Sequence, residues 1–248
     1  MWKCPVCDKE NNAEMVCPTC GYDRTCDYEQ YPTAFAVTTA PPPRPPPRQW
    51  QAKQGPGLME LVMRWFDAPQ DTAAAERCFR RLADGGDPAA QWWLGTAYAR
   101  GWGAEQDAAQ AVRWYRKAAE QGCAQAQYRL GDCYYFGSGV EKDTVQAAQW
   151  YQKAARQGHA RAQWWLGHCY ELGRGVQKDA VQAAQWYQKA AEQGLDEAQN
   201  NLGNCYYLGI GVERNLAQAV RWYRKAAEQG NKDAKTALRK MAKRSLFS

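Results

Sequence analysis

The chain has 248 residues and a formal net charge of +6, and 45% of its residues are apolar and 23% charged, which is the composition of an ordinary folded protein. No stretch approaches the roughly 20 apolar residues that span a bilayer, and the N-terminus lacks the apolar region of a signal peptide. We therefore expect a cytoplasmic protein without membrane contact. Its 10 cysteines are expected to be metal ligands or buried thiols before disulfides.

Basic charge is concentrated in short segments. Residues 34–54 carry three basic and no acidic residues, and the last nineteen residues have a net charge of +5. Residues 1–33 have a net charge of −3, and residues 55–229 are near neutral at +1. This distribution argues against a broad nucleic-acid footprint along the main part of the chain.

Residues 1–33 contain two C-x2-C pairs separated by nine residues: Cys4 with Cys7, and Cys17 with Cys20. Each tight turn can direct two thiolates at one ion, and two such turns complete a tetrahedron around Zn²⁺. The segment resembles a short zinc ribbon, in which the metal stabilises a fold too small to bury a core. Two disulfides or a redox dithiol are the alternatives. A closed four-cysteine site predicts structural rather than catalytic zinc, and Cys26 is expected to be a spare thiol.

Residues 34–54 include Pro-Pro-Pro-Arg-Pro-Pro-Pro-Arg, which predicts an extended polyproline II spacer. From residue 55 to residue 230 the sequence repeats. Leu-Gly, Trp-Tyr and Lys-Ala-Ala each recur four times at intervals of 36 residues. Residues 55–86 form a degenerate first unit, which suits a terminal cap, and four full units follow.

Each unit predicts two helices. In the second full unit, Ala126, Leu130 and Tyr134 share one face of the first helix, and Gly137 and Gly139 then break it. Capping boxes predict the start of each second helix, and they pair Asp107 with Gln110, Asp143 with Gln146, Asp179 with Gln182, and Asn215 with Gln218. Gly131, in the middle of the first helix, would cost about 1 kcal/mol relative to Ala unless a neighbouring helix approaches closely, and that close approach is our prediction.

This repeat closely resembles the Sel-1-like repeat, a relative of the tetratricopeptide repeat. The resemblance is carried by Ala124–Gly158 and Ala160–Gly194, with small departures in the units on either side. It implies an all-α fold, in which an α/α superhelical solenoid follows the small zinc ribbon. It also implies that the solenoid is a docking surface for other proteins, without naming the partner.

A second stripe on the first helices is expected to bind that partner. By resemblance to the tetratricopeptide arrangement, the stripe lines the concave surface, and it changes from unit to unit while the core positions repeat. Aromatic side chains, which dominate interface hot spots, lead it in three units, although each ring could instead pack against the neighbouring repeat. The candidate binding residues are Trp92, Thr96, Tyr128, Asp132, Tyr135, Trp164, His168, Glu171, Asn200, Asn204 and Tyr207.

Other candidates are weaker. His168 and Cys169 are neighbours that point about 100° apart on a helix, no serine lies in G-x-S-x-G, and the G-x-G turns lack a third glycine, so we do not expect an enzyme. Cys133, Cys169 and Cys205 are expected to be small buried hydrophobes, and Trp93 and Trp165 to pack between repeats.

Residues 231–248 predict a basic capping helix. The alternative function is a nucleic-acid-associated protein acting through the ribbon, linker and tail. The oligomeric state is left open.

Overall fold

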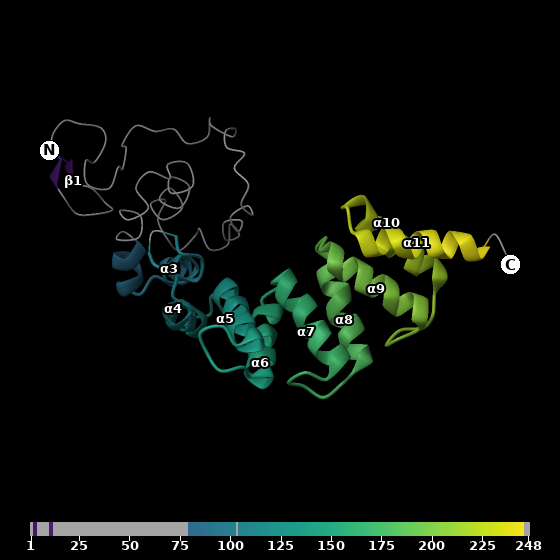
Figure 1. Cartoon of the computed structure of the whole chain (residues 1–248), viewed down its shortest axis with the longest axis horizontal. Coiled ribbons are helices and arrows are strands. Elements are labelled where there is room, and N and C mark those ends of the chain that lie inside the picture. Colours follow the sequence, from purple (N-terminus) through teal and green to yellow (C-terminus); the bar gives the residue numbers. More distant parts are fainter. Residues whose placement is uncertain (1, 4–9, 12–78, 103, 246–248) are drawn as a thin grey trace. The chain divides into compact units, whose positions relative to one another are not determined.

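The computed structural model describes residues 2–3, 10–11, 79–102 and 104–245 (Figure 1). The chain forms two compact units, Met1–Trp114 and Tyr115–Ser248. The cysteine pairs, the proline-rich segment and residues 55–78 lie outside the described residues.

The first unit contains a short sheet and the start of the repeats. Strand β1 (Trp2–Lys3) pairs antiparallel with β2 (Glu10–Asn11), with Trp2 opposite Asn11. Residues 79–84 are helical, and α3 (Pro88–Arg100) and α4 (Ala108–Glu120) follow, α4 continuing into the second unit. Asp87 caps α3 by accepting the Ala90 N–H at 2.7 Å.

The second unit is a run of helices, each of which packs on the next (Figure 1). They are α5 (Ala124–Phe136), α6 (Thr144–Arg156), α7 (Ala160–Leu172), α8 (Ala180–Glu192), α9 (Asp196–Leu208), α10 (Leu216–Glu228) and α11 (Lys232–Ser245). The first helices of the repeats are α5, α7 and α9, and the second helices are α6, α8 and α10. Helix α11 contacts both α10 and α9.

Close approach of the paired helices explains the recurring Leu-Gly and Trp-Tyr motifs. A Cβ atom on Gly131 would lie 2.7 Å from Cδ1 of Tyr151, and Gly203 stands in the same relation to Tyr223. Tyr151 is fully buried, so its ring occupies the space that a side chain at position 131 would need. The predicted reason for Gly131 is therefore confirmed.

The turn between the two helices also depends on glycine. Gly175 has φ of +73°, and a Cβ atom there would lie 1.9 Å from the Thr144 carbonyl oxygen. The turn that follows α7 therefore rests directly on the start of α6 in the preceding repeat. Both the backbone conformation and the lack of space exclude a larger residue.

The predicted caps of the second helices are confirmed, and the reciprocal half of the capping box differs from the prediction. The side chain of Asp143 accepts the N–H groups of Val145 and Gln146 at 2.9 and 3.0 Å. The N–H of Asp143 donates to the Tyr134 carbonyl at 2.9 Å instead of to the Gln146 side chain. The chain folds back onto the end of α5 here, and an orphan carbonyl of that helix supplies the acceptor.

The core stripe follows the prediction at two of three positions. Ala126 and Leu130 are fully buried. Tyr134 is only half-buried, and its hydroxyl accepts a hydrogen bond from Arg116 at 2.9 Å. Tyr135, which the sequence placed in the groove stripe, is 6% exposed, and Arg174 donates a hydrogen bond to its hydroxyl.

A network of buried glutamines joins three helices in each repeat. Gln163 is 5% exposed, donates to the Ala155 carbonyl at 3.1 Å and accepts from Gln193 at 2.7 Å. Gln127 and Gln199 make equivalent bonds. These bonds give a second donor to carbonyls at the end of the preceding second helix, each of which also accepts the N–H of the glycine three residues later.

Helix α11 occupies the place of a further first helix, and one of its residues departs from the repeat pattern. Counting 36 residues from Gly203 leads to Arg239. Because a Cβ atom at the glycine position would collide with the tyrosine of a following second helix, Arg239 is incompatible with that packing. Asn231 caps α11 by accepting the Ala234 N–H at 3.0 Å, and it donates to Asp196 at the start of α9.

Candidate binding surface

The stripe on the first helices divides into buried and accessible positions. In the second unit Tyr128, Tyr135 and Asn200 are buried. Asp132, Trp164, His168 and Tyr207 are half-buried, and Glu171 and Asn204 are exposed. The accessible candidates therefore come mainly from the middle and the end of each helix, and the leading aromatic position is mostly internal.

The first unit carries two stripe residues, Trp92 and Thr96. Their exposed fractions are 3% and 1%, and the Thr96 hydroxyl donates to the Trp92 carbonyl at 3.0 Å. Trp92 lies against Trp93, with ring centroids 4.7 Å apart. Trp93 stacks on Phe79 at 6.4 Å. Both stripe side chains therefore pack inside this unit.

Buried tyrosine hydroxyls from the second helices hold the polar stripe residues in place. The Tyr151 hydroxyl donates to Asp132 at 2.9 Å, and the Tyr223 hydroxyl donates to Asn204 at 2.7 Å. In the middle repeat His168 stands at the equivalent position, and the Tyr187 hydroxyl donates instead to Glu171, one turn further on. These tyrosines end the recurring Trp-Tyr motif, and the repeat pattern alone did not predict this positioning role.

Asp132 is the most electrostatically perturbed carboxyl of the stripe. Burial raises its pKa from the ordinary 3.8 to about 6, and the hydrogen bond from Tyr151 and the charge of Arg129 oppose the rise. The Arg129 guanidinium lies 3.6 Å from the carboxylate. Burial, with the nearby Asp132 charge, raises the pKa of Tyr128 to about 12.

His159 lies beside this group and caps α7. Its ring stacks on Tyr128 with centroids 4.8 Å apart, and its Nδ1 accepts the Ala162 N–H at 3.2 Å. Burial, with the charges of Arg129 and Arg161, lowers its pKa from 6.5 to about 4. The neutral imidazole is therefore the form that the fold favours.

Helix α7 carries two stripe residues with unsatisfied polar atoms. Within the described part of the chain, neither Trp164 Nε1 nor His168 Nδ1 has a hydrogen-bond partner, although both atoms are out of solvent. Their neighbour Trp165 stacks on Tyr151 of the preceding repeat, with ring centroids 5.8 Å apart and planes 8° apart. The predicted packing of Trp165 between repeats is therefore confirmed.

The thiols of the repeats have the environment of small core residues. Cys169 and Cys205 are buried and Cys133 is half-buried, and all three are free. Burial raises the pKa of Cys169 and of Cys205 to about 11. Among the described residues no group of three or more His, Cys, Asp or Glu side chains could hold a metal ion. The described residues therefore add no second metal site to the predicted one.

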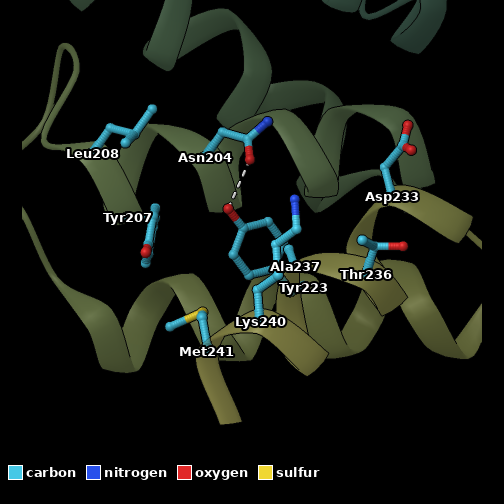
Figure 2. A pocket seen from close by; sticks show the side chains of 9 residues that line it. All are labelled: Asn204, Tyr207, Leu208, Tyr223, Asp233, Thr236, Ala237, Lys240 and Met241. Carbon is cyan, nitrogen blue, oxygen red and sulfur yellow. Dashed lines mark hydrogen bonds between the residues drawn. The ribbon is translucent and has the colours of Figure 1, made fainter. Parts of the chain in front are cut away.

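The stripe leads into a pocket at the end of the second unit (Figure 2). The pocket has a volume of about 690 Å³ and is lined by α9, α10 and α11. Asn204 and Tyr207 of the stripe line it. Thr236 and Lys240, which line it from α11, stand 36 residues after Asn200 and Asn204. The predicted stripe ended at Tyr207, although the same 36-residue spacing extends it to Thr236 and Lys240 in α11.

None of the helices in the described ranges is long and apolar enough to cross a membrane.

Among curated proteins, none matches this chain. The crystal structure of c5321, a protective antigen present in uropathogenic Escherichia coli strains that displays an SLR fold, is 39% identical with a TM-score of 0.71, over 75% of this chain and 41% of that chain. A Sel1 repeat protein from Oxalobacter formigenes is 38% identical with a TM-score of 0.64, over 69% of this chain and 49% of that one.

This chain therefore spans less than half the length of those two proteins. The immunity protein PA5088 from Pseudomonas aeruginosa, at 24% identity and a TM-score of 0.52 over 75% of this chain and 70% of that one, is similar in fold alone. The Sel1 repeat model matches residues 65–87, 88–123, 124–159, 160–195 and 196–231. These matches cover well over half of the sequence, and the chain belongs to the Sel1 repeat family.

Proposed function

We propose that this chain is an interaction scaffold that binds a segment of a protein partner along the first-helix face of its repeats. Sel1 repeat proteins generally serve as protein-interaction scaffolds, which supports this class of function. The partner would meet the accessible part of the stripe, which is centred on His168, Glu171, Asn204 and Tyr207. Tyr128 would support this surface from inside the fold.

One observation carries the proposal. In three repeats a constant buried tyrosine of the second helix donates its hydroxyl to a variable acceptor on the first helix: Asp132, Glu171 or Asn204. The framework is therefore the same in these three repeats, while the polar groups that it positions differ. A rigid framework with different side chains at equivalent places is well suited to specific recognition.

The two unsatisfied atoms on α7 favour the same surface. Buried polar atoms without partners are uncommon in folded proteins, and Trp164 Nε1 and His168 Nδ1 lie one helical turn apart on the stripe. A partner that approached α7 could complete their hydrogen bonding after small side-chain rotations. Among the described residues Trp92 Nε1 and Glu197 Oε2 also lack a partner, but only α7 carries two such atoms, and it is therefore the proposed centre of the binding surface.

We further propose a structural zinc ion held by Cys4, Cys7, Cys17 and Cys20, and a cytoplasmic location. The spacing of the cysteines supports the metal site. The antiparallel pairing of β1 with β2 brackets the first cysteine pair in the sequence, which is compatible with a ribbon. The four cysteines themselves lie outside the described residues.

The test is a pull-down from native lysate with the wild-type chain and two triple variants. The first variant replaces accessible stripe residues with Ala: His168, Glu171 and Tyr207. The matched control replaces exposed side chains of the second helices: Gln149, Gln185 and Arg221. Each pull-down is divided into nuclease-treated and untreated halves, and bound proteins are identified by mass spectrometry.

The proposal requires a discrete protein partner that survives nuclease, is lost with the stripe variant and is kept by the control. If the stripe variant retains the partner, the surface is assigned to the wrong face. If recovery collapses after nuclease treatment, the chain acts instead through nucleic acid, with the ribbon, linker and basic tail as the elements to test.

A further inference from the structure

The pocket between α9 and α11 exists because α11 carries a small residue where an earlier repeat has a large ring. Between α5 and α7, Trp165 lies against Tyr135 and Phe136 and stacks on Tyr151. Counting 72 residues from each of the four leads to Ala237 and to Tyr207, Leu208 and Tyr223, all of which line the pocket. Where Trp165 fills the space between α5 and α7, Ala237 therefore leaves a hollow between α9 and α11.

The lining of this hollow has distinct apolar and charged parts (Figure 2). Tyr207, Leu208 and Met241 lie together on one side, and Asp233 and Thr236 lie on the other. Leu208 is 58% exposed, although it is a large apolar side chain at the mouth of a pocket. An apolar group that entered this side would remove Leu208 and Met241 from water.

Lys240 supplies the positive charge of the pocket, and Asp233 supplies a negative charge at its other side. Its side chain rises from α11 beside the ring of Tyr223, between the two sides (Figure 2). Among the described residues none forms an ion pair with its ammonium. Asp233 lies in the first turn of α11, where the helix N-terminus favours its negative charge. Lys232, Lys235, Arg239 and Lys240 against Asp233 make this stretch of the helix strongly basic.

We infer that this pocket is an anchoring site for an acidic peptide segment of a protein partner, which would insert a large apolar side chain beside Tyr207, Leu208 and Met241 and place an adjacent carboxylate on Lys240. The inference rests on the proposed function, because the pocket continues the stripe, and it adds the chemistry of the partner. Complementary charge favours an acidic partner, and the volume of about 690 Å³ accommodates a large side chain with its neighbours.

The test measures fluorescence anisotropy of a fluorescein-labelled synthetic peptide that contains Leu-Glu-Phe-Glu between Gly-Ser flanks. A peptide with Gln in place of each Glu tests the need for charge, and a peptide with Lys in place of each Glu tests its sign. The full chain is compared with Lys240→Glu and with Ala237→Trp, which fills the hollow with the ring that Trp165 provides between α5 and α7. Lys235→Glu is the control, because it makes the same charge change on α11 outside the pocket. Thermal melts of the three variants establish that each is folded.

We expect the acidic peptide to bind the wild-type chain and to bind Lys240→Glu and Ala237→Trp at least about tenfold more weakly, with a change below about threefold for Lys235→Glu. Lys240→Glu should in turn prefer the Lys peptide. The inference is overturned if the wild-type chain does not bind the acidic peptide, if Ala237→Trp binds it unchanged, or if Lys235→Glu matches Lys240→Glu. If one of these results is found but the triple stripe variant still loses a captured partner in the pull-down, the proposed function stands and only the pocket assignment fails. If the stripe variant also keeps the partner, the scaffold proposal fails as well.

Discussion

Gly167 and Tyr187 are packed so closely that a Cβ atom on Gly167 would lie 2.7 Å from Cδ1 of the tyrosine ring. It would also lie 3.2 Å from the Ala183 carbonyl oxygen. The ring belongs to α8 and the glycine to α7, so this contact sets the distance between the two helices of the repeat. The same ring donates its hydroxyl to Glu171, and the contact therefore links the core to the binding surface.

Gly167→Ala should destabilise the chain by about 2 kcal/mol, because overpacking typically costs about 1–3 kcal/mol and the ring cannot move without disturbing the helix pair. This loss exceeds the gain of about 1 kcal/mol that Ala brings to a helix interior. Urea unfolding monitored by circular dichroism measures the change. Gly194→Asn is the control, because Gly194 has a positive φ with open space around it and Asn tolerates that conformation. If Gly167→Ala were as stable as the wild type, the close contact would not be present.

A substitution in the glutamine network should destabilise the chain nearly as much as Gly167→Ala does. Gln163→Ala removes the side-chain donor to the buried Ala155 carbonyl, which keeps the Gly158 N–H, and the acceptor of the exposed Gln193, and each lost hydrogen bond costs about 0.5–1.5 kcal/mol. We expect a loss of about 1–3 kcal/mol in urea unfolding. Gln149→Ala, at an exposed position on α6, should change stability by less than about 0.5 kcal/mol. Equal effects of the two substitutions would contradict a structural role for the network.

The sequence predicted the helices, the caps and the helix contacts, because each depends on residues that recur every 36 positions. Asp143 and Gly131 are examples whose roles could be derived from one repeat. The distinction between Tyr134 and Tyr135 could not be derived, because both lie near the edge of the core stripe and the choice depends on Arg116 and Arg174, which come from other elements. The pocket was also missed, because it arises where Ala237 replaces the ring that Trp165 supplies between α5 and α7.

Asp132→Asn should stabilise the chain at pH 8 by about 1–3 kcal/mol, since each unit of pKa shift corresponds to about 1.4 kcal/mol. The folded-state pKa of Asp132 is raised, so its favourable contribution is complete below pH 3.8 and is lost as the pH rises to about 6. Asn keeps the acceptor for Tyr151, as Asn204 does for Tyr223. The free energy of unfolding is measured at pH 4 and pH 8 for the wild-type chain and for Asp132→Asn. The prediction is contradicted if the difference between the two pH values is the same in both proteins.

His159→Asn should change the pH dependence of the free energy of unfolding in the opposite sense to Asp132→Asn. The folded-state pKa of His159 is lowered, so its contribution is complete above pH 6.5 and is lost as the pH falls to about 4. Asn retains the cap on α7 and cannot be protonated in this range. With Asp132 alone remaining, the variant should gain stability as the pH falls from 6 to 4, and the Asp132→Asn variant should lose it. If the free energy of unfolding changes with pH in the same direction in both variants, the raised pKa of Asp132 and the lowered pKa of His159 are not both correct.

The proposed zinc site predicts one Zn²⁺ per chain. Elemental analysis of protein purified without added metal should give close to one equivalent, and Cys4→Ser or Cys17→Ser should lower it strongly because a thiolate ligand is lost. Cys26→Ser is the control and should leave the zinc content unchanged. Equal loss with Cys26→Ser, or metal-free protein with paired disulfides, would reject the four-cysteine site.

The most direct test of the scaffold proposal is site-specific photo-crosslinking in cells. A photoreactive amino acid is placed at Glu171 on the stripe or at Gln185, an exposed position on the second helix of the same repeat. The account predicts a discrete protein adduct from position 171 that is absent from position 185 and unaffected by nuclease. An adduct formed equally from both positions, or formed from position 185 alone, would contradict binding along the first-helix face.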